Sequence, residues 1–161
     1  MTEILEKTER AYGGEHDRPL GGYLRILSVY GGTVAVVAAT AALAGRRMPD
    51  RVGVMDLLLM AACTHKVARL VAKDPVTSPI RAPFTRYEGQ SGPAELQEAP
   101  RGTMGELLAC PFCLAQWVAT GYATGLVFAP RFTRLVGATM TAVAISDWLQ
   151  LAYAKLMKSA S

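Results

Sequence analysis

The residues with the clearest chemical potential are two cysteines in the sequence Cys110-Pro-Phe-Cys113. A Cys-x-x-Cys pair near a helix N-terminus favours the thiolate, which is both a nucleophile and a ligand for soft metals. The pair therefore predicts a redox dithiol, or part of a site for zinc or another thiophilic metal, or a purely structural helix start. Tetrahedral zinc needs two further ligands, and the nearby candidates are Cys63 and His65. Because residues two apart on a helix point about 200° apart, both cannot face one ion without unwinding.

A second group of candidate residues is mainly basic and lies further towards the N-terminus. Its first three members recur every four residues, which places them on one face of a helix. The candidates are His65, Arg69, Lys73, Asp74, Arg81 and Arg86. Such a cluster at a membrane surface binds lipid phosphates or the acidic face of a partner protein. The alternative is that these residues only anchor the end of a helix at the interface.

Two acidic residues, Asp56 and Asp147, interrupt otherwise apolar segments. An unpaired carboxylate inside a bilayer is costly, so such a residue is expected to be paired or functional. Asp147 is expected at about the same depth in the bilayer as His65, so His65 or nearby Arg69 is its expected partner. A structural ion pair is the favoured interpretation, and a proton relay in a small transporter subunit is the alternative.

The elements that position these residues are long apolar segments. Hydrophobic residues make up 51% of the 161 residues, and charged residues make up 19%. A bilayer core of about 30 Å needs about 20 helical residues. The predicted spans are residues 26–44, 52–72, 107–129 and 135–157. The second carries basic residues in its latter half, so it either spans with a hydrated last turn or enters the bilayer only part of the way.

The second and third spans are separated by the segment Asp74–Arg101, which holds five prolines and is predicted to be a loop without strands. Thr103 and Glu106 match a capping box that would open the next helix. Pro111 suits the first turn of a helix, which predicts a restart at that residue.

The predicted fold class is therefore all-α, an integral membrane bundle of about four helices with a Pro-rich loop between the second and third. A polar tail, residues 1–22, precedes a single transmembrane domain over residues 23–158. Gly121 and Gly125 form a GxxxG pair, a predicted face for homo-oligomer formation.

The distribution of positive charge predicts the orientation. Twelve of the 17 Lys and Arg residues lie in the N-terminal segment, the long loop and the C-terminus, whereas the two short connectors carry five. Positive charge marks the cytoplasmic side, so both termini and the loop are expected to be cytoplasmic. No basic run is dense enough to indicate binding to nucleic acid.

The run THKVARLVAKDPVTSPIRAPF, followed by GELLACPFCLAQW, closely resembles a bacterial membrane family catalogued as domain of unknown function 1360. The resemblance extends from about Gly21 to Tyr153. It implies a multi-pass protein of the bacterial cytoplasmic membrane without an established catalytic activity. We therefore expect a non-enzymatic component that binds a partner protein or a lipid headgroup at its cytoplasmic face. The alternatives are a thiol redox or metal site on the two cysteines, or a transporter subunit.

Overall fold

The structure of the protein, a computed structural model, describes residues 2–13, 18–49 and 51–160. In chain order these residues form α1 (Thr2–Gly13), α2 (Leu20–Leu43), α3 (Val54–Lys73), the 3₁₀ turn η1 (Pro75–Thr77), α4 (Ser78–Arg81), β1 (Thr85–Gly92), β2 (Glu95–Pro100), α5 (Gly102–Ala109), α6 (Pro111–Phe128) and α7 (Pro130–Ala160). The chain is mainly helical, as predicted. The polar tail contains the helix α1, and residues 14–17 of that tail lie outside the described residues.

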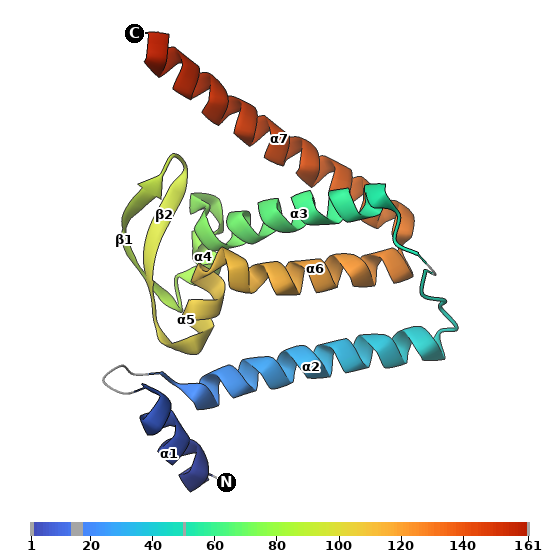
Figure 1. Cartoon of the computed structure of the whole chain (residues 1–161), viewed down its shortest axis with the longest axis vertical. Coiled ribbons are helices and arrows are strands. Elements are labelled where there is room, and N and C mark those ends of the chain that lie inside the picture. The colour runs from blue at the N-terminus through green and yellow to red at the C-terminus, as the bar shows by residue number, and fades with distance from the viewer. Residues whose placement is uncertain (1, 14–17, 50, 161) are drawn as a thin grey trace.

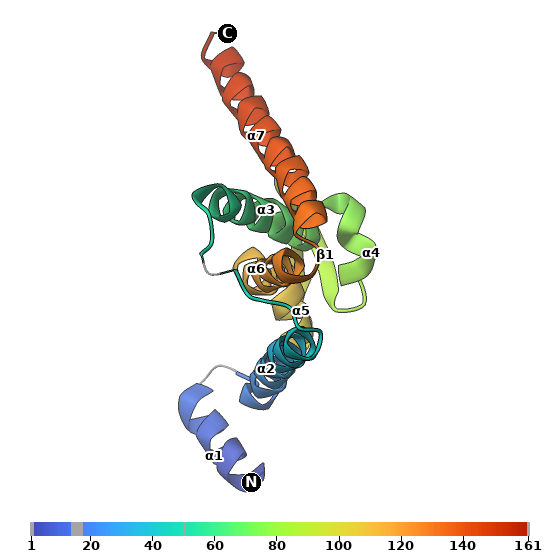
Figure 2. The same cartoon turned by 90° about the vertical axis from the view of Figure 1, so that its right-hand side faces the viewer.

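The helices α2, α6 and α3 lie side by side in a row, with α7 crossing the outer side of α3 (Figures 1 and 2). α3 packs most extensively, against both α6 and α7. The hairpin, α4 and α5 lie at one end of this row, and the α2–α3 and α6–α7 connections lie at the other (Figure 1). The C-terminal half of α7 diverges from the other helices.

The contacts between helices depend on small side chains. The core cluster is Ala68 and Ala72 on α3 with Leu114 on α6. A Cβ atom added at Gly137 on α7 would overlap the Tyr122 side chain, so this glycine allows α6 and α7 to approach closely. Close approach at small residues is typical of helices that pack inside a membrane.

α2 joins the row mainly through polar and aromatic contacts. The Tyr30 hydroxyl bonds to Thr120 at 2.8 Å and accepts from the Gln116 amide at 2.7 Å. Its ring meets Trp117 edge-on, with the centroids 5.1 Å apart. Hydrogen bonds of this kind between apolar helices hold membrane helices together.

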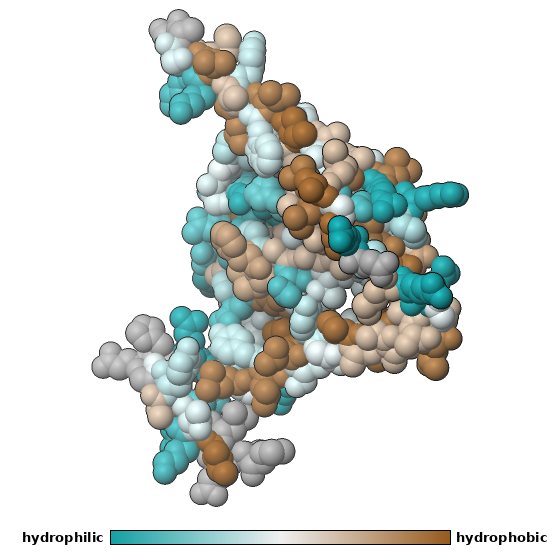
Figure 3. Space-filling model, turned by 45° about the vertical axis from the view of Figure 1, so that its right-hand side comes forward, coloured by the Kyte–Doolittle hydropathy of each residue, from teal (hydrophilic) through white to brown (hydrophobic). Residues whose placement is uncertain are grey.

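Large apolar side chains remain exposed on the outer helices. On α2 they include Leu27, Val36 and Leu43, and on α7 they include Leu135 and Leu149. On the face shown in Figure 3, apolar residues lie open over much of the molecule, and hydrophilic residues lie between them and along both the left-hand and the right-hand edges. Two of the described helices, α2 and residues 130–159 of α7, are long and apolar enough to cross a membrane. The prediction of four spans is therefore supported in part by composition.

The segment predicted as a loop contains a β-hairpin, so the prediction of a fold without strands was wrong. β1 and β2 pair antiparallel, from Thr85 opposite Pro100 to Gly92 opposite Glu95. The prolines lie where they do not break the ladder, because Pro93 is in the turn and Pro100 ends β2. Ala94 completes the turn with a positive φ of 57°.

The third predicted span is divided at Cys110 into α5 and α6, which confirms the predicted restart at Pro111. A proline disfavours the helical conformation in the residue before it. Cys110, which precedes Pro111, is accordingly extended, with φ −104° and ψ 107°. The predicted capping box is wrong, because no side chain caps the start of α5. Glu106 instead accepts a hydrogen bond of 2.5 Å from the Tyr23 hydroxyl of α2.

Candidate functional site

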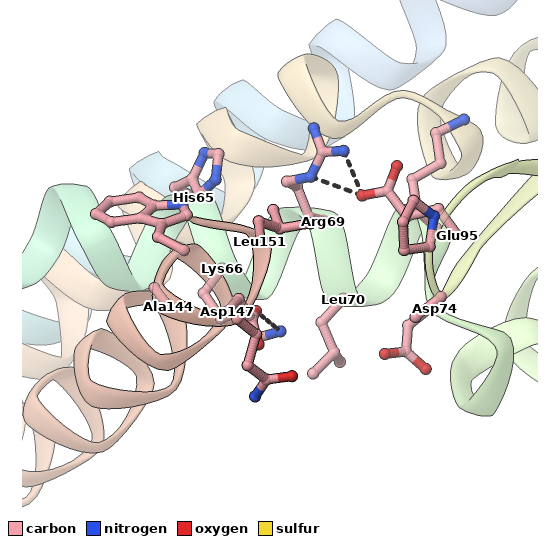
Figure 4. A pocket seen from close by; sticks show the side chains of 14 residues that line it. His65, Lys66, Arg69, Leu70, Asp74, Glu95, Ala144, Asp147 and Leu151 are labelled. Carbon is pink, nitrogen blue, oxygen red and sulfur yellow. Dashed lines mark hydrogen bonds and ion pairs between the residues drawn. The ribbon is translucent and has the colours of Figure 1, made fainter. Parts of the chain in front are cut away.

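A cavity of about 420 Å³ lies between α3, α7 and the tip of the hairpin (Figure 4). Its basic lining comes from one face of α3 and consists of His65, Lys66, Arg69 and Lys73. Its acidic lining consists of Asp74, Glu95 and Asp147. Its apolar wall includes Leu70, Ala144, Trp148 and Leu151. The helical face predicted from the four-residue spacing therefore borders a single cavity.

Two ion pairs cross this cavity. The Lys66 ammonium donates to Asp147 at 2.6 Å, joining α3 to α7. Asp147 thus forms the structural ion pair that was the favoured interpretation. Its partner is Lys66, so the prediction of His65 or Arg69 as the partner was wrong. The Arg69 guanidinium donates to Glu95 at the hairpin tip, at 3.0 Å through Nε and also through Nη2.

The remaining basic lining is less constrained. The His65 ring stands beside Trp148, with centroids 6.0 Å apart and planes tilted by 54°. Lys73 forms no ion pair with any carboxylate in the described part of the chain. The cavity thus offers two cationic or protonatable side chains outside its ion pairs, together with an indole face.

Arg81 does not line the cavity. Its side chain is fully buried, and it forms a two-pronged pair with Glu98 of β2, at 2.8 and 3.0 Å. The same guanidinium donates to the backbone oxygens of Val71 (2.6 Å) and Asp74 (3.1 Å) at the end of α3, and to Thr77 Oγ1 (2.7 Å). Arg81 therefore joins the hairpin to the end of α3.

The electrostatics of this buried pair follow from its geometry. The Arg81 guanidinium holds the pKa of Glu98 below its usual range, and a hydrogen bond from Thr85 lowers it further against the opposing effect of burial. Arg86 lies apart from both the cavity and this pair. It is exposed on β1, where it contacts Glu88 at 3.3 Å.

The two cysteines of the Cys-x-x-Cys sequence lie together at the junction of α5 and α6. The Cys113 thiol donates to Cys110 Sγ, with the two sulfur atoms 2.6 Å apart. Cys63 is buried on α3, and His65 faces α7 beside Trp148. No group of three or more His, Cys, Asp or Glu side chains able to hold a metal occurs among the described residues.

The other candidates lie at the far ends of the helices. Asp56 is paired with Arg134 through two bonds of 2.7 and 2.8 Å, which join the start of α3 to α7. Gly125 is in close contact with Thr133 of α7, whereas Gly121 has open space around it. The surface predicted for homo-oligomer formation is thus partly covered within the chain.

Lys66, Trp148 and Glu95 are among the cavity residues that were not predicted as site residues. Lys66 and Trp148 adjoin predicted residues, and their place on the same helices was the available signal. Glu95 had no local signal, because it reaches the cavity only through the hairpin.

A family model described as protein of unknown function (DUF1360) matches residues 58–153, more than half of the chain. The chain belongs to this family. The matched stretch contains every residue that lines the cavity and both cysteines of the Cys-x-x-Cys sequence. It begins later than the start near Gly21 expected from the resemblance. No curated protein and no solved structure matches the chain.

Proposed function

We propose that this protein is a multi-pass protein of the bacterial cytoplasmic membrane that binds the phosphate of an anionic phospholipid in the cavity between α3, α7 and the hairpin. The many large apolar side chains exposed on α2 and α7 support the membrane location, because extensive exposed apolar surface is rare on soluble monomers. The small-residue core between α3 and α6 supports it as well.

In this proposal α2, α3, α6 and α7 are the four spans. α3 has 20 residues, which at 1.5 Å each reach across a hydrocarbon core of about 30 Å. The charged residues of α3 make its full insertion into the bilayer costly. Two of them, Asp56 and Lys66, are however paired with residues of α7. Pairing within the protein is the usual condition under which such residues are tolerated in a membrane.

The orientation is proposed from the charge distribution. The hairpin end of the row carries the long basic segment, and the opposite end carries the two short connectors (Figure 1). With 12 of 17 basic residues on the hairpin side, that side is assigned to the cytoplasm. The cavity then opens at the depth of the headgroups.

The observation that carries the lipid assignment is the composition of the cavity wall. Basic side chains of α3 line the cavity together with apolar residues of α7, including Ala144 and Leu151 (Figure 4). An amphiphile with an anionic head matches these two parts of the wall, because its phosphate accepts from the basic residues and its acyl chain lies along α7. Of the three carboxylates that also line the cavity, Asp147 and Glu95 are neutralised by Lys66 and Arg69.

Arg69 is the residue we assign to direct contact with phosphate. Its side chain is 42% exposed and already donates two hydrogen bonds to Glu95. Both bonds go to one oxygen, Glu95 Oε1, and a guanidinium donates to phosphate oxygens as it does to carboxylate oxygens, so a phosphate can replace Glu95. Lys73 supplies a second positive charge beside it.

The test is titration of phosphatidylglycerol into delipidated protein in detergent, followed by native mass spectrometry. The double variant Arg69→Ala/Lys73→Ala removes two charges worth about 1 kcal/mol each near an anionic lipid, so affinity should fall about 30-fold. Arg46→Ala/Arg47→Ala is the matched control. It also removes two exposed charges, but these lie in the α2–α3 connection, at the end of the row of helices opposite the hairpin. Arg81 is avoided because its replacement would disturb the fold.

Equal phosphatidylglycerol binding by the two double variants would overturn the proposal. Equal binding of phosphatidylcholine and phosphatidylglycerol by the wild-type protein would overturn it too. If only the cavity variant lost a co-purifying protein while its lipid binding stayed unchanged, the cavity would be a protein-docking site instead.

A further inference from the structure

The Cys-x-x-Cys sequence forms a second candidate site, separate from the cavity. Neither Cys110 nor Cys113 lines the cavity. The cysteines lie where α5 ends and α6 begins, whereas the cavity lies between α3 and α7. The site is accessible, since Cys113 is exposed and lies in the first turn of α6, which the proposed arrangement places at the cytoplasmic edge of the bilayer.

The local backbone holds the two thiols against each other. Pro111 prevents Cys110 from continuing the helix, so Cys110 becomes the N-cap of α6. Its Sγ accepts from the backbone N–H of Cys113 at 3.2 Å and from the Cys113 thiol, with the sulfur atoms 2.6 Å apart. A disulfide bond is about 2.05 Å long, so oxidation needs little movement of the chain.

We propose that Cys110 and Cys113 form a reversible dithiol–disulfide couple that exchanges with an external disulfide. A thiolate of the pair attacks one sulfur of the external disulfide, the external S–S bond breaks, and one external thiolate leaves and takes up a proton. The second cysteine loses its proton and attacks the mixed disulfide at the first Sγ, releasing the second external thiolate. Two electrons thereby pass from the dithiol to the external disulfide, which leaves as two thiols.

Two features favour this function over a purely structural helix start: the sulfur atoms already face each other, and the site is open to an external disulfide. A third feature favours it over a metal site, because the described residues provide no third metal ligand near the pair. The third cysteine, Cys63, is buried on α3 and does not join the pair. On the cytoplasmic side the dithiol would be the resting form, and oxidation would be transient.

In the test, the 161-residue protein in detergent is equilibrated with mixtures of reduced and oxidised glutathione. Free thiols are then labelled under denaturing conditions with a maleimide that adds a resolvable mass. The wild-type protein should carry three labels when reduced and one when oxidised, since it has three cysteines. The transition should depend on the square of the reduced glutathione concentration and should reverse with dithiothreitol. The Cys63→Ser variant should pass from two labels to none with the same midpoint.

Cys110→Ser and Cys113→Ser are the matched controls, because each leaves one member of the pair. Each should form only a mixed disulfide with glutathione, with a first-order dependence on reduced glutathione. If the wild-type protein kept three labels at every glutathione ratio, or formed only disulfide-linked dimers, the proposal would be overturned. Lipid binding is not measured in this experiment, so its result is independent of the function proposed for the cavity.

Discussion

Replacing Glu98 with glutamine tests whether the buried ion pair with Arg81 holds the hairpin on the helices. The side chains of Arg81 and Glu98 are 0% and 5% exposed, and the guanidinium also donates to the end of α3. Glu98→Gln keeps the size of the side chain but removes its charge, which leaves the buried guanidinium without a counter-ion. Breaking a buried pair from one side costs about 3–5 kcal/mol. Because glutamine retains one acceptor oxygen, about 3 kcal/mol is expected.

This loss of stability should be measured locally, in the hairpin, because the long helices dominate the global unfolding of the protein. Amide hydrogen exchange over residues 85–100 reports the local opening equilibrium. A loss of about 3 kcal/mol corresponds to about 150-fold faster exchange in this segment. Glu88→Gln is the matched control, since its partner Arg86 is 68% exposed. An exposed pair contributes about 1 kcal/mol or less, so the control should change exchange by less than about fivefold.

The same pair makes the hairpin sensitive to acid. The pKa of Glu98 in the folded protein is lowered below its ordinary value of about 4.3, chiefly by Arg81. The stabilisation is therefore complete above the ordinary pKa and is lost as the pH falls through the lowered one. Protection, corrected for intrinsic exchange, should fall in this acid range in the wild-type protein and stay flat in Glu98→Gln. If Glu98→Gln exchanged no faster than Glu88→Gln at neutral pH, the buried pair would not be what anchors the hairpin.

Two further variants test contacts of α7. Gly137→Ala places a methyl group against the Tyr122 side chain and should destabilise the protein by about 1–3 kcal/mol, seen as a lower Tm in detergent. Gly121→Ala, which meets open space, should leave Tm unchanged or slightly raised, and an equal fall in both variants would contradict the packing described. Asp147→Asn should lower Tm because it leaves the ammonium of Lys66, whose side chain is 17% exposed, without its counter-ion. An unchanged Tm for Asp147→Asn would show that this ion pair does not stabilise the fold.

The long helices were predictable because apolar runs bounded by charges or prolines are local signals. The restart at Pro111 was predictable for the same reason, since a proline restricts its preceding residue. The basic face of α3 followed from the helical period alone. Each of these inferences needed only neighbouring residues.

The features that were not predicted depend on contacts between distant parts of the chain. The hairpin was missed because its strands are polar and flanked by prolines, without clear alternation. Arg81 was predicted to belong to a basic surface cluster, whereas it is buried against Glu98 of β2. Lys66 pairs with Asp147 because of the way α7 crosses α3, which no local pattern encodes.

The most direct test of the proposed membrane arrangement is thiol labelling from outside intact cells. Single cysteines are introduced as Ser91→Cys in β1 and Arg47→Cys in the α2–α3 connector, both exposed positions, after the three native cysteines are replaced by serine. With four spans and a cytoplasmic hairpin, a membrane-impermeant maleimide should label Arg47→Cys in intact cells and Ser91→Cys only after permeabilisation. Labelling of Ser91→Cys but not Arg47→Cys in intact cells, or recovery of the protein in the soluble fraction without detergent, would contradict the arrangement.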